Sequence, residues 1–175
     1  MDLEFFEKLA YYVVKGQPTS ELPILALQGL EDGYESNTLI LLSGMPSNES
    51  PFVIDEYFQK MLIELGLNFF DKQKAAFFLI QSAVKKIVAK QVDPFEGCKW
   101  IFDNLLSRVE LSDQDQQFVY DSIGLGEIYG LYIAVEDILS STMNWDKSKT
   151  NEQLIDELKL DMLEKLSNWK FSFRL

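Results

Sequence analysis

Apolar residues recur along most of the chain at the three- and four-residue spacing of an amphipathic helix. The clearest case follows Ser50-Pro51, where a capping serine and a first-turn proline start a helix that ends at Gly66. Its apolar stripe consists of Ile54, Tyr57, Phe58, Met61, Leu62 and Leu65. No alternation of apolar and polar residues is long enough to predict a strand. The pattern therefore predicts an all-α fold of seven or eight helices.

Glycines and prolines divide the first part of the chain into shorter predicted helices. One runs over 2–15 and ends at a glycine, which suits the left-handed C-terminal cap. A second extends from a cap at Thr19 or Ser20 through Glu31, and a third begins after Ser36 and ends at Gly44. On these two helices, the residues expected to face inward are Ile24, Leu27, Leu30, Leu39, Ile40 and Leu42.

The second part of the chain continues the helical pattern. Helices are predicted over 69–91, 93–109, 127–142 and 150–169. The first of them is apolar nearly all round, which is typical of a buried helix. Cys98 and Leu139 are expected on inward faces, so Cys98 is interpreted as a buried, inert thiol. The segment 112–126 stays open between a short helix and a loop.

Length and composition favour one soluble domain over 1–175. The chain has 175 residues and 47% apolar residues, which is enough to bury a sizeable core. Its start, Met1 to Glu4, lacks the basic region of a signal peptide, and its apolar runs are too short to span a bilayer. A single cysteine is compatible with a reducing compartment. We therefore expect a cytoplasmic protein with no membrane partner.

Charge is the strongest compositional signal. The chain has 28 acidic and 16 basic residues, a net charge of −12. Two blocks carry most of the excess: 1–70 has 11 acidic and 3 basic residues, and 111–145 has 6 acidic residues and no basic one. Such a charge disfavours binding to nucleic acid and favours a basic protein partner.

The two acidic blocks supply the predicted partner-binding residues. If the fold brings the blocks together, they form one negative face in which Tyr34 or Trp145 serves as an aromatic anchor. The predicted residues are Glu31, Asp32, Tyr34, Glu35, Asp113, Asp115, Asp121 and Trp145. The alternative is that these acidic residues are scattered and only solvate the surface. Trp100 is a second candidate for an exposed contact residue.

The residues available for catalysis are few. Histidine is absent, which excludes Ser-His-Asp and Cys-His catalysis and the histidine-containing zinc and di-iron motifs. What remains is carboxylate-only chemistry, either a glycosidase-like acid pair or a magnesium-dependent hydrolase site on helices, with Glu4 and Glu7 or Asp161 and Glu164 as candidate pairs. Both pairs are better explained as solvated helix faces. We therefore expect no enzyme activity, no cofactor and no bound metal.

The segment from Leu22 to Leu67 resembles a family of small, acidic, all-helical bacterial immunity proteins. The resemblance rests on the run LALQGLEDGYES from Leu25 to Ser36, on the leucines and Gly44 that follow, and on the Glu64-Leu65-Gly66-Leu67 helix end. Asp93-Pro94-Phe95-Glu96-Gly97 is similar to a helix start in such proteins. The resemblance implies an all-α inhibitor that neutralises a toxin and has no activity of its own.

Three functions are therefore compatible with the sequence. The first is a stoichiometric immunity protein whose acidic face covers a cationic toxin, for example a nuclease. The second is a structural or regulatory scaffold that associates with itself, and the third is the carboxylate-based hydrolase. The sequence leaves the oligomeric state open.

Overall fold

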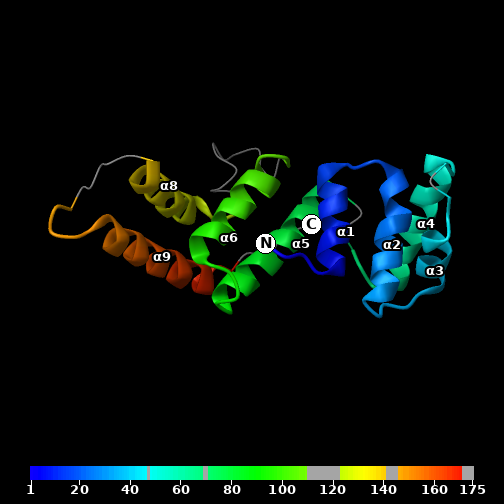
Figure 1. The fold of residues 1–175 in the computed structure, drawn as a ribbon, viewed down its shortest axis with the longest axis horizontal. Coiled ribbons are helices and arrows are strands. Elements are labelled where there is room, and N and C mark those ends of the chain that lie inside the picture. Colours follow the sequence, from blue (N-terminus) through cyan, green and yellow to red (C-terminus); the bar gives the residue numbers. More distant parts are fainter. Residues whose placement is uncertain (47, 69–70, 110–122, 141–145, 171–175) are drawn as a thin grey trace. The chain divides into compact units, whose positions relative to one another are not determined.

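The computed structural model of the protein describes residues 1–46, 48–68, 71–109, 123–140 and 146–170 (Figure 1). The chain divides into two compact units, Asp2–Leu79 and Ile80–Leu175, and Met1 is grouped with the second. The boundary lies inside one helix, α5 (Lys72–Val88). A single domain over 1–175 remains a prediction.

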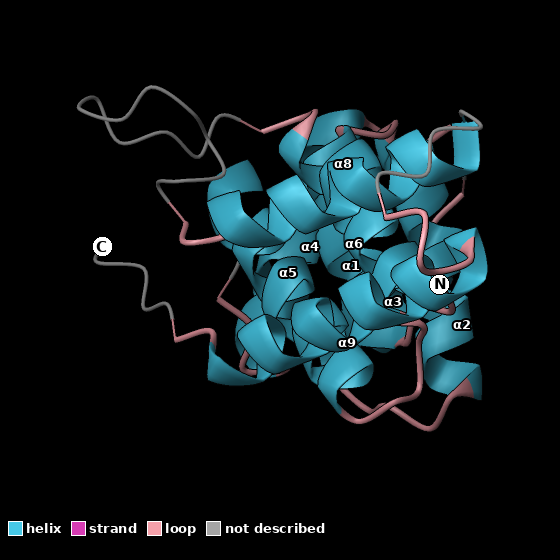
Figure 2. Ribbon diagram, turned by 90° about the vertical axis from the view of Figure 1, so that its left-hand side faces the viewer, coloured by secondary structure: helices cyan, strands magenta, loops and turns pink. Residues whose placement is uncertain are grey.

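Helices make up all the regular structure of the described residues, and no strand occurs among them (Figure 2). Before α5 the chain forms α1 (Phe5–Lys15), α2 (Leu22–Glu31), α3 (Asn37–Ser43) and α4 (Pro51–Glu64). After it come α6 (Pro94–Ile101), α8 (Gly126–Ser140) and α9 (Asn151–Asn168). A 3₁₀ turn, Thr19–Glu21, leads into α2, and a π-helical turn, Phe102–Leu106, continues α6. The all-α fold class is confirmed.

Several helix ends lie at the capping residues that the sequence indicates. Gly16 closes α1 with a φ of 63°, and Pro51 is the first residue of α4. The side chain of Asp93 accepts the N–H groups of Phe95 and Glu96 at the start of α6. Thr150 and Gln153 form the capping box of α9. These local hydrogen bonds satisfy backbone groups that a helix end leaves without intrahelical partners.

In the unit Asp2–Leu79, α2 packs against α1 and α3, and α3 packs against α4 (Figure 1). Aromatic rings connect α1 to the rest of this unit, since the Tyr12 ring meets Phe58 edge-on with centroids 5.5 Å apart. The largest fully buried side chains of this unit are Phe5, Leu9, Leu22, Leu39, Leu42, Ile54, Met61, Leu62 and Leu79. They form a core to which every α-helix of the unit contributes.

The orientation of α2 differs from the prediction. Its small residues Ala26 and Gly29 are buried, whereas Ile24 and Leu27 are 61% and 49% exposed. The cause is the close approach of α1: a Cβ at position 29 would lie 2.3 Å from Cζ of Phe5. Because the Phe5 ring lies directly on Gly29, α2 turns its small face toward α1. The predicted inward positions of Ile24 and Leu27 are therefore wrong.

The helix α5 is shorter than the predicted range 69–91. Its fully buried positions are Ala75, Ala76, Leu79, Ile80, Ala83 and Ile87. It ends at Val88, and Lys90 just beyond it has a φ of 58° although glycine usually occupies this left-handed position. The N–H of Lys90 donates to the carbonyl of Ile87, and that of Gln91 donates to the carbonyl of Lys86. These two bonds hold a non-glycine residue in a strained conformation.

In the unit Ile80–Leu175, α6 packs against α8 and α9, which also pack against each other. Phe95 of α6 stacks on Tyr132 of α8 with centroids 5.5 Å apart. Cys98 is fully buried as predicted, and desolvation, with a smaller effect of Asp93, raises its pKa to about 12. Leu139 of α8 is exposed, so its predicted inward position is wrong.

Candidate functional site

The turn between α2 and α3 holds the predicted partner-binding residues that lie in the described part of the chain. It contains Glu31, Asp32, Tyr34 and Glu35. Gly33 has a φ of 88°, and its N–H donates to the carbonyl of Leu30 while the N–H of Tyr34 donates to that of Gly29, both at 3.0 Å. This is the Schellman arrangement of a helix end. The turn therefore has a backbone fixed by hydrogen bonds.

The three carboxylates of this turn are exposed. Among the described residues, neither Glu31 nor Asp32 nor Glu35 forms a salt bridge with a lysine. Glu31 is the last residue of α2, and Asp32 and Glu35 follow it, at the helix end where the partial charge of the dipole is also negative. No basic residue lies in the last turn of α2. The turn is therefore a point of uncompensated negative charge that a cationic group would stabilise.

Tyr34 has a structural role as well as an exposed part. Its ring is half-buried, with centroids 4.9 Å from the ring of Phe5 and 4.7 Å from that of Phe6. These contacts attach the turn to α1 and fix the tyrosine in place. A fixed aromatic side chain loses little entropy on binding, which suits an anchor residue.

A fourth carboxylate, that of Glu64 at the end of α4, lies at the start of α3. Glu64 accepts the backbone N–H of Thr38 at 2.9 Å and also the hydroxyl of Thr38. Both hydrogen bonds lower the pKa of Glu64, and the bond from the Thr38 hydroxyl has the larger effect. Ser36 caps the same helix by accepting the N–H of Leu39 at 2.9 Å. Glu64 was not among the predicted site residues, because its partner lies 26 residues away along the chain.

Exposed apolar side chains adjoin the acidic turn. Ile24, Leu27 and Glu31 are spaced three and four residues apart, so they form one outward stripe on α2. On α3, Ile40 and Leu41 are 55% and 56% exposed, so the predicted inward position of Ile40 is wrong. We call the outward residues Ile24, Leu27, Glu31, Asp32, Tyr34, Glu35 and Ile40 the α2–α3 surface.

A shallow depression lies within this surface. It has a volume of about 780 Å³, and Leu30, Tyr34, Glu35, Ile40 and Glu64 are among the residues that line it. Carboxylates, an aromatic ring and aliphatic side chains therefore meet in one concave region. The sequence contains one signal for this surface: the Ala26 and Gly29 pair indicates which face of α2 packs closely.

The other predicted contact residues, Asp113, Asp115, Asp121 and Trp145, lie outside the described residues. The meeting of the two acidic blocks in one face therefore remains a prediction. Trp100, the second candidate, is half-buried on α6. In the described ranges, no group of three or more carboxylates or thiols is arranged to hold a metal ion. No helix among them is long and apolar enough to cross a membrane.

The fold is all-helical in its described part, and the α2–α3 surface is acidic and apolar. Comparisons of the chain with protein-family models, with curated proteins and with solved structures found no match.

Proposed function

We propose that this protein binds a cationic protein partner stoichiometrically through the α2–α3 surface, and that it acts as an immunity protein that neutralises a bacterial toxin. One observation carries the proposal: the exposed stripe of Ile24 and Leu27 runs directly into the carboxylates of Glu31, Asp32 and Glu35. Interfaces combine a few apolar contacts with charges that steer association. The α2–α3 surface offers both.

The combination favours a protein partner over a small ligand. Large apolar residues exposed side by side on a helix are typical of interaction surfaces. Acidic residues around them attract a basic partner and repel nucleic acid, so a basic nuclease is a suitable target. Inhibition would then follow from covering the partner's cationic face, without any catalytic residue in this chain.

The first test is whether the gene immediately upstream encodes a protein with a basic C-terminal domain. We expect that it does, and this domain is then expressed alone and together with this protein while bacterial growth is measured. We expect the domain to arrest growth and co-expression to restore it. Failure of the protein to restore growth, or an upstream gene that encodes no basic domain, contradicts the toxin proposal.

Variants then locate the interface. Asp32→Lys with Glu35→Lys reverses two charges of the turn, and Ile24→Ser with Leu27→Ser removes the apolar stripe. Both double variants should lose affinity for the basic domain and keep the wild-type melting temperature, because exposed side chains contribute little to folding. Asp113→Lys with Asp115→Lys tests the second acidic block in the same assay.

The matched control is Glu152→Lys with Asp156→Lys on α9. Both are exposed acidic residues without a salt bridge among the described residues. Their replacement by lysine changes the net charge by the same amount as the turn variant does. The control should retain affinity. If the control and the turn variant lose affinity equally, net charge alone explains the loss. That result would contradict the α2–α3 surface as the interface.

A self-associating scaffold is the second candidate, and the exposed apolar residues on α2, α3 and α4 favour it. On α4, Phe52 and Ile63 are among the exposed large apolar side chains. Sedimentation velocity over a wide concentration range separates the two functions. The immunity proposal predicts a monomer in the absence of partner, and a dimer that Ile24→Ser with Leu27→Ser dissociates would favour the scaffold.

A further inference from the structure

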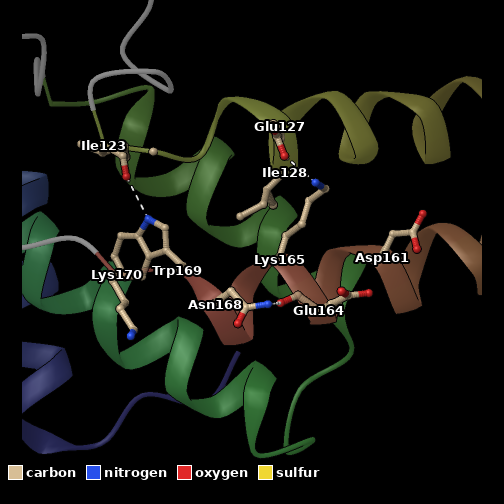
Figure 3. A pocket seen from close by; sticks show the side chains of 10 residues that line it. Ile123, Glu127, Ile128, Asp161, Glu164, Lys165, Asn168, Trp169 and Lys170 are labelled. Atoms are coloured by element: carbon tan, nitrogen blue, oxygen red, sulfur yellow. Dashed lines mark hydrogen bonds and ion pairs between the residues drawn. The ribbon is translucent and has the colours of Figure 1, made fainter.

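A cavity of about 620 Å³ lies between α8 and α9 in the unit Ile80–Leu175 (Figure 3). This volume is within the range of small-ligand sites, roughly 300–1,000 Å³. Its lining includes the side chains of Ile128, Glu127, Asp161, Glu164, Lys165, Asn168, Trp169 and Lys170. None of these residues belongs to the α2–α3 surface, so a ligand in this cavity is independent of the proposed function.

The cavity has an apolar and aromatic end. The indole N–H of Trp169 donates to the carbonyl of Ile123 at 2.9 Å, which fixes the ring (Figure 3). Gly124 lies beside this ring with a φ of 69°, and a Cβ on it would be 3.6 Å from the indole nitrogen. The ring of Trp169 and the side chain of Ile128 therefore give the cavity a preformed apolar wall.

Negative charge is in excess around Lys165 of α9. Lys165 forms a salt bridge with Glu127 of α8. Asp161 and Glu164 also stabilise its charged form, and all three carboxylates contribute to the raised pKa of Lys165. Neither Asp161 nor Glu164 has a salt bridge within the described ranges. The lining thus holds three carboxylates and two ammonium groups, those of Lys165 and Lys170, and the remaining negative charge favours a further cation.

We propose that this cavity binds an organic cation, a guanidinium or alkylammonium group whose apolar stem lies against Trp169 and Ile128. The charged group lies at Asp161 and Glu164, and the indole contributes apolar contact to the stem. Lys170 lies on the opposite side of Trp169 from Lys165 in the view of Figure 3. It repels a cation from that end, so the charged group is directed toward the carboxylates.

The cationic group can belong to either of two ligands. One is a free organic cation, and the other is an arginine or lysine side chain of a protein. The test is a titration of the full-length protein, followed by the indole N–H signals in proton–nitrogen NMR. The signal of Trp169 is assigned by its loss in Trp169→Phe. The probes are n-butylguanidinium, its neutral counterpart n-butylurea, and the capped tripeptide Gly-Arg-Gly.

We expect n-butylguanidinium to shift the Trp169 signal with saturation in the millimolar range, and n-butylurea to leave it unchanged. A tripeptide that binds at least as tightly as butylguanidinium assigns the site to a protein side chain, and a weaker one assigns it to free cations. Either result supports a cation site. No saturable shift with any probe, or an equal shift with butylurea, overturns it.

Variants test the carboxylates. Asp161→Asn with Glu164→Gln should weaken n-butylguanidinium binding by about twofold to thirtyfold, the range of two exposed charge pairs. The matched control, Glu152→Gln with Asp156→Asn, removes the same charge from the first two turns of the same helix and should leave the affinity unchanged. Equal affinities in the two double variants would overturn the assigned position of the cation.

Discussion

The close contact between Phe5 and Gly29 determines which side of α2 is exposed, and Gly29→Ala tests it. The new Cβ would lie 2.3 Å from Cζ of Phe5 and 2.5 Å from its Cε2. The ring is 1% exposed and packs against Phe6 and Tyr34, so it has little room to move. Overpacking of this kind costs about 1–3 kcal/mol. Alanine offsets part of this, because it favours a helix over glycine by about 1 kcal/mol.

Gly130→Ala on α8 is the matched control for this substitution. Among the described residues, no atom outside the backbone of α8 itself lies within 4 Å of a Cβ at position 130, so the helix propensity of alanine is the effect expected there. Urea unfolding followed by far-ultraviolet circular dichroism measures both variants. We expect Gly130→Ala to raise the free energy of unfolding above that of the wild type. The free energy of unfolding of Gly29→Ala should be lower than that of Gly130→Ala by about 1–3 kcal/mol, which is the steric cost alone. Equal free energies for the two variants would refute the close packing of α1 on α2.

Three further predictions concern single side chains. Because burial raises the pKa of Cys98 to about 12, the native thiol should not react with a disulfide reagent at about pH 8, whereas urea-unfolded protein should react at once. The pKa of Glu64 is lowered by its bonds to Thr38, so its contribution to stability is present above the ordinary value of 4.5 and is lost as the pH falls through the lower, folded-state value. The unfolding midpoints of wild type and Glu64→Gln should therefore differ most near neutral pH and converge in acid. Lys90→Gly should stabilise the protein by about 1 kcal/mol in urea unfolding, because glycine relieves a φ of 58°; a destabilised variant would contradict strain at this position.

The sequence predicts helix ends well because their causes are local. Gly16, Ser36, Pro51 and Asp93 act within a few residues of themselves, through a left-handed conformation, a capping hydrogen bond or a missing N–H. These interactions do not depend on the rest of the fold. The fold class follows from them and from the helical spacing of apolar residues.

Facing directions were harder to predict, because they depend on which helices meet. On α2, the stripe of Ile24 and Leu27 and the stripe of Ala26 and Gly29 have the same spacing, and burial of the larger residues is the usual choice. The Phe5 ring fills the space over Gly29, so the smaller residues are buried and Ile24 and Leu27 are exposed. The spacing alone does not contain this contact.

The candidate site was predictable only in part, for the same reason. The carboxylates Glu31, Asp32 and Glu35 are visible as a charged run in the sequence, and the structure places all three on the exposed turn. The apolar half of the surface depends on the orientation of α2, and Glu64 reaches Thr38 across 26 residues. Such long-range contacts leave no periodic signal.

Hydrogen–deuterium exchange of the protein alone and in complex with the basic domain tests the proposed interface most directly. Binding at the α2–α3 surface excludes water from α2 and from the turn that follows it. We predict slower exchange in peptides that cover residues 22–43, and unchanged exchange over α9 from residue 151 to 158. Unchanged exchange over residues 22–43 in a saturated complex, with protection confined to other segments, would contradict the α2–α3 surface as the interface.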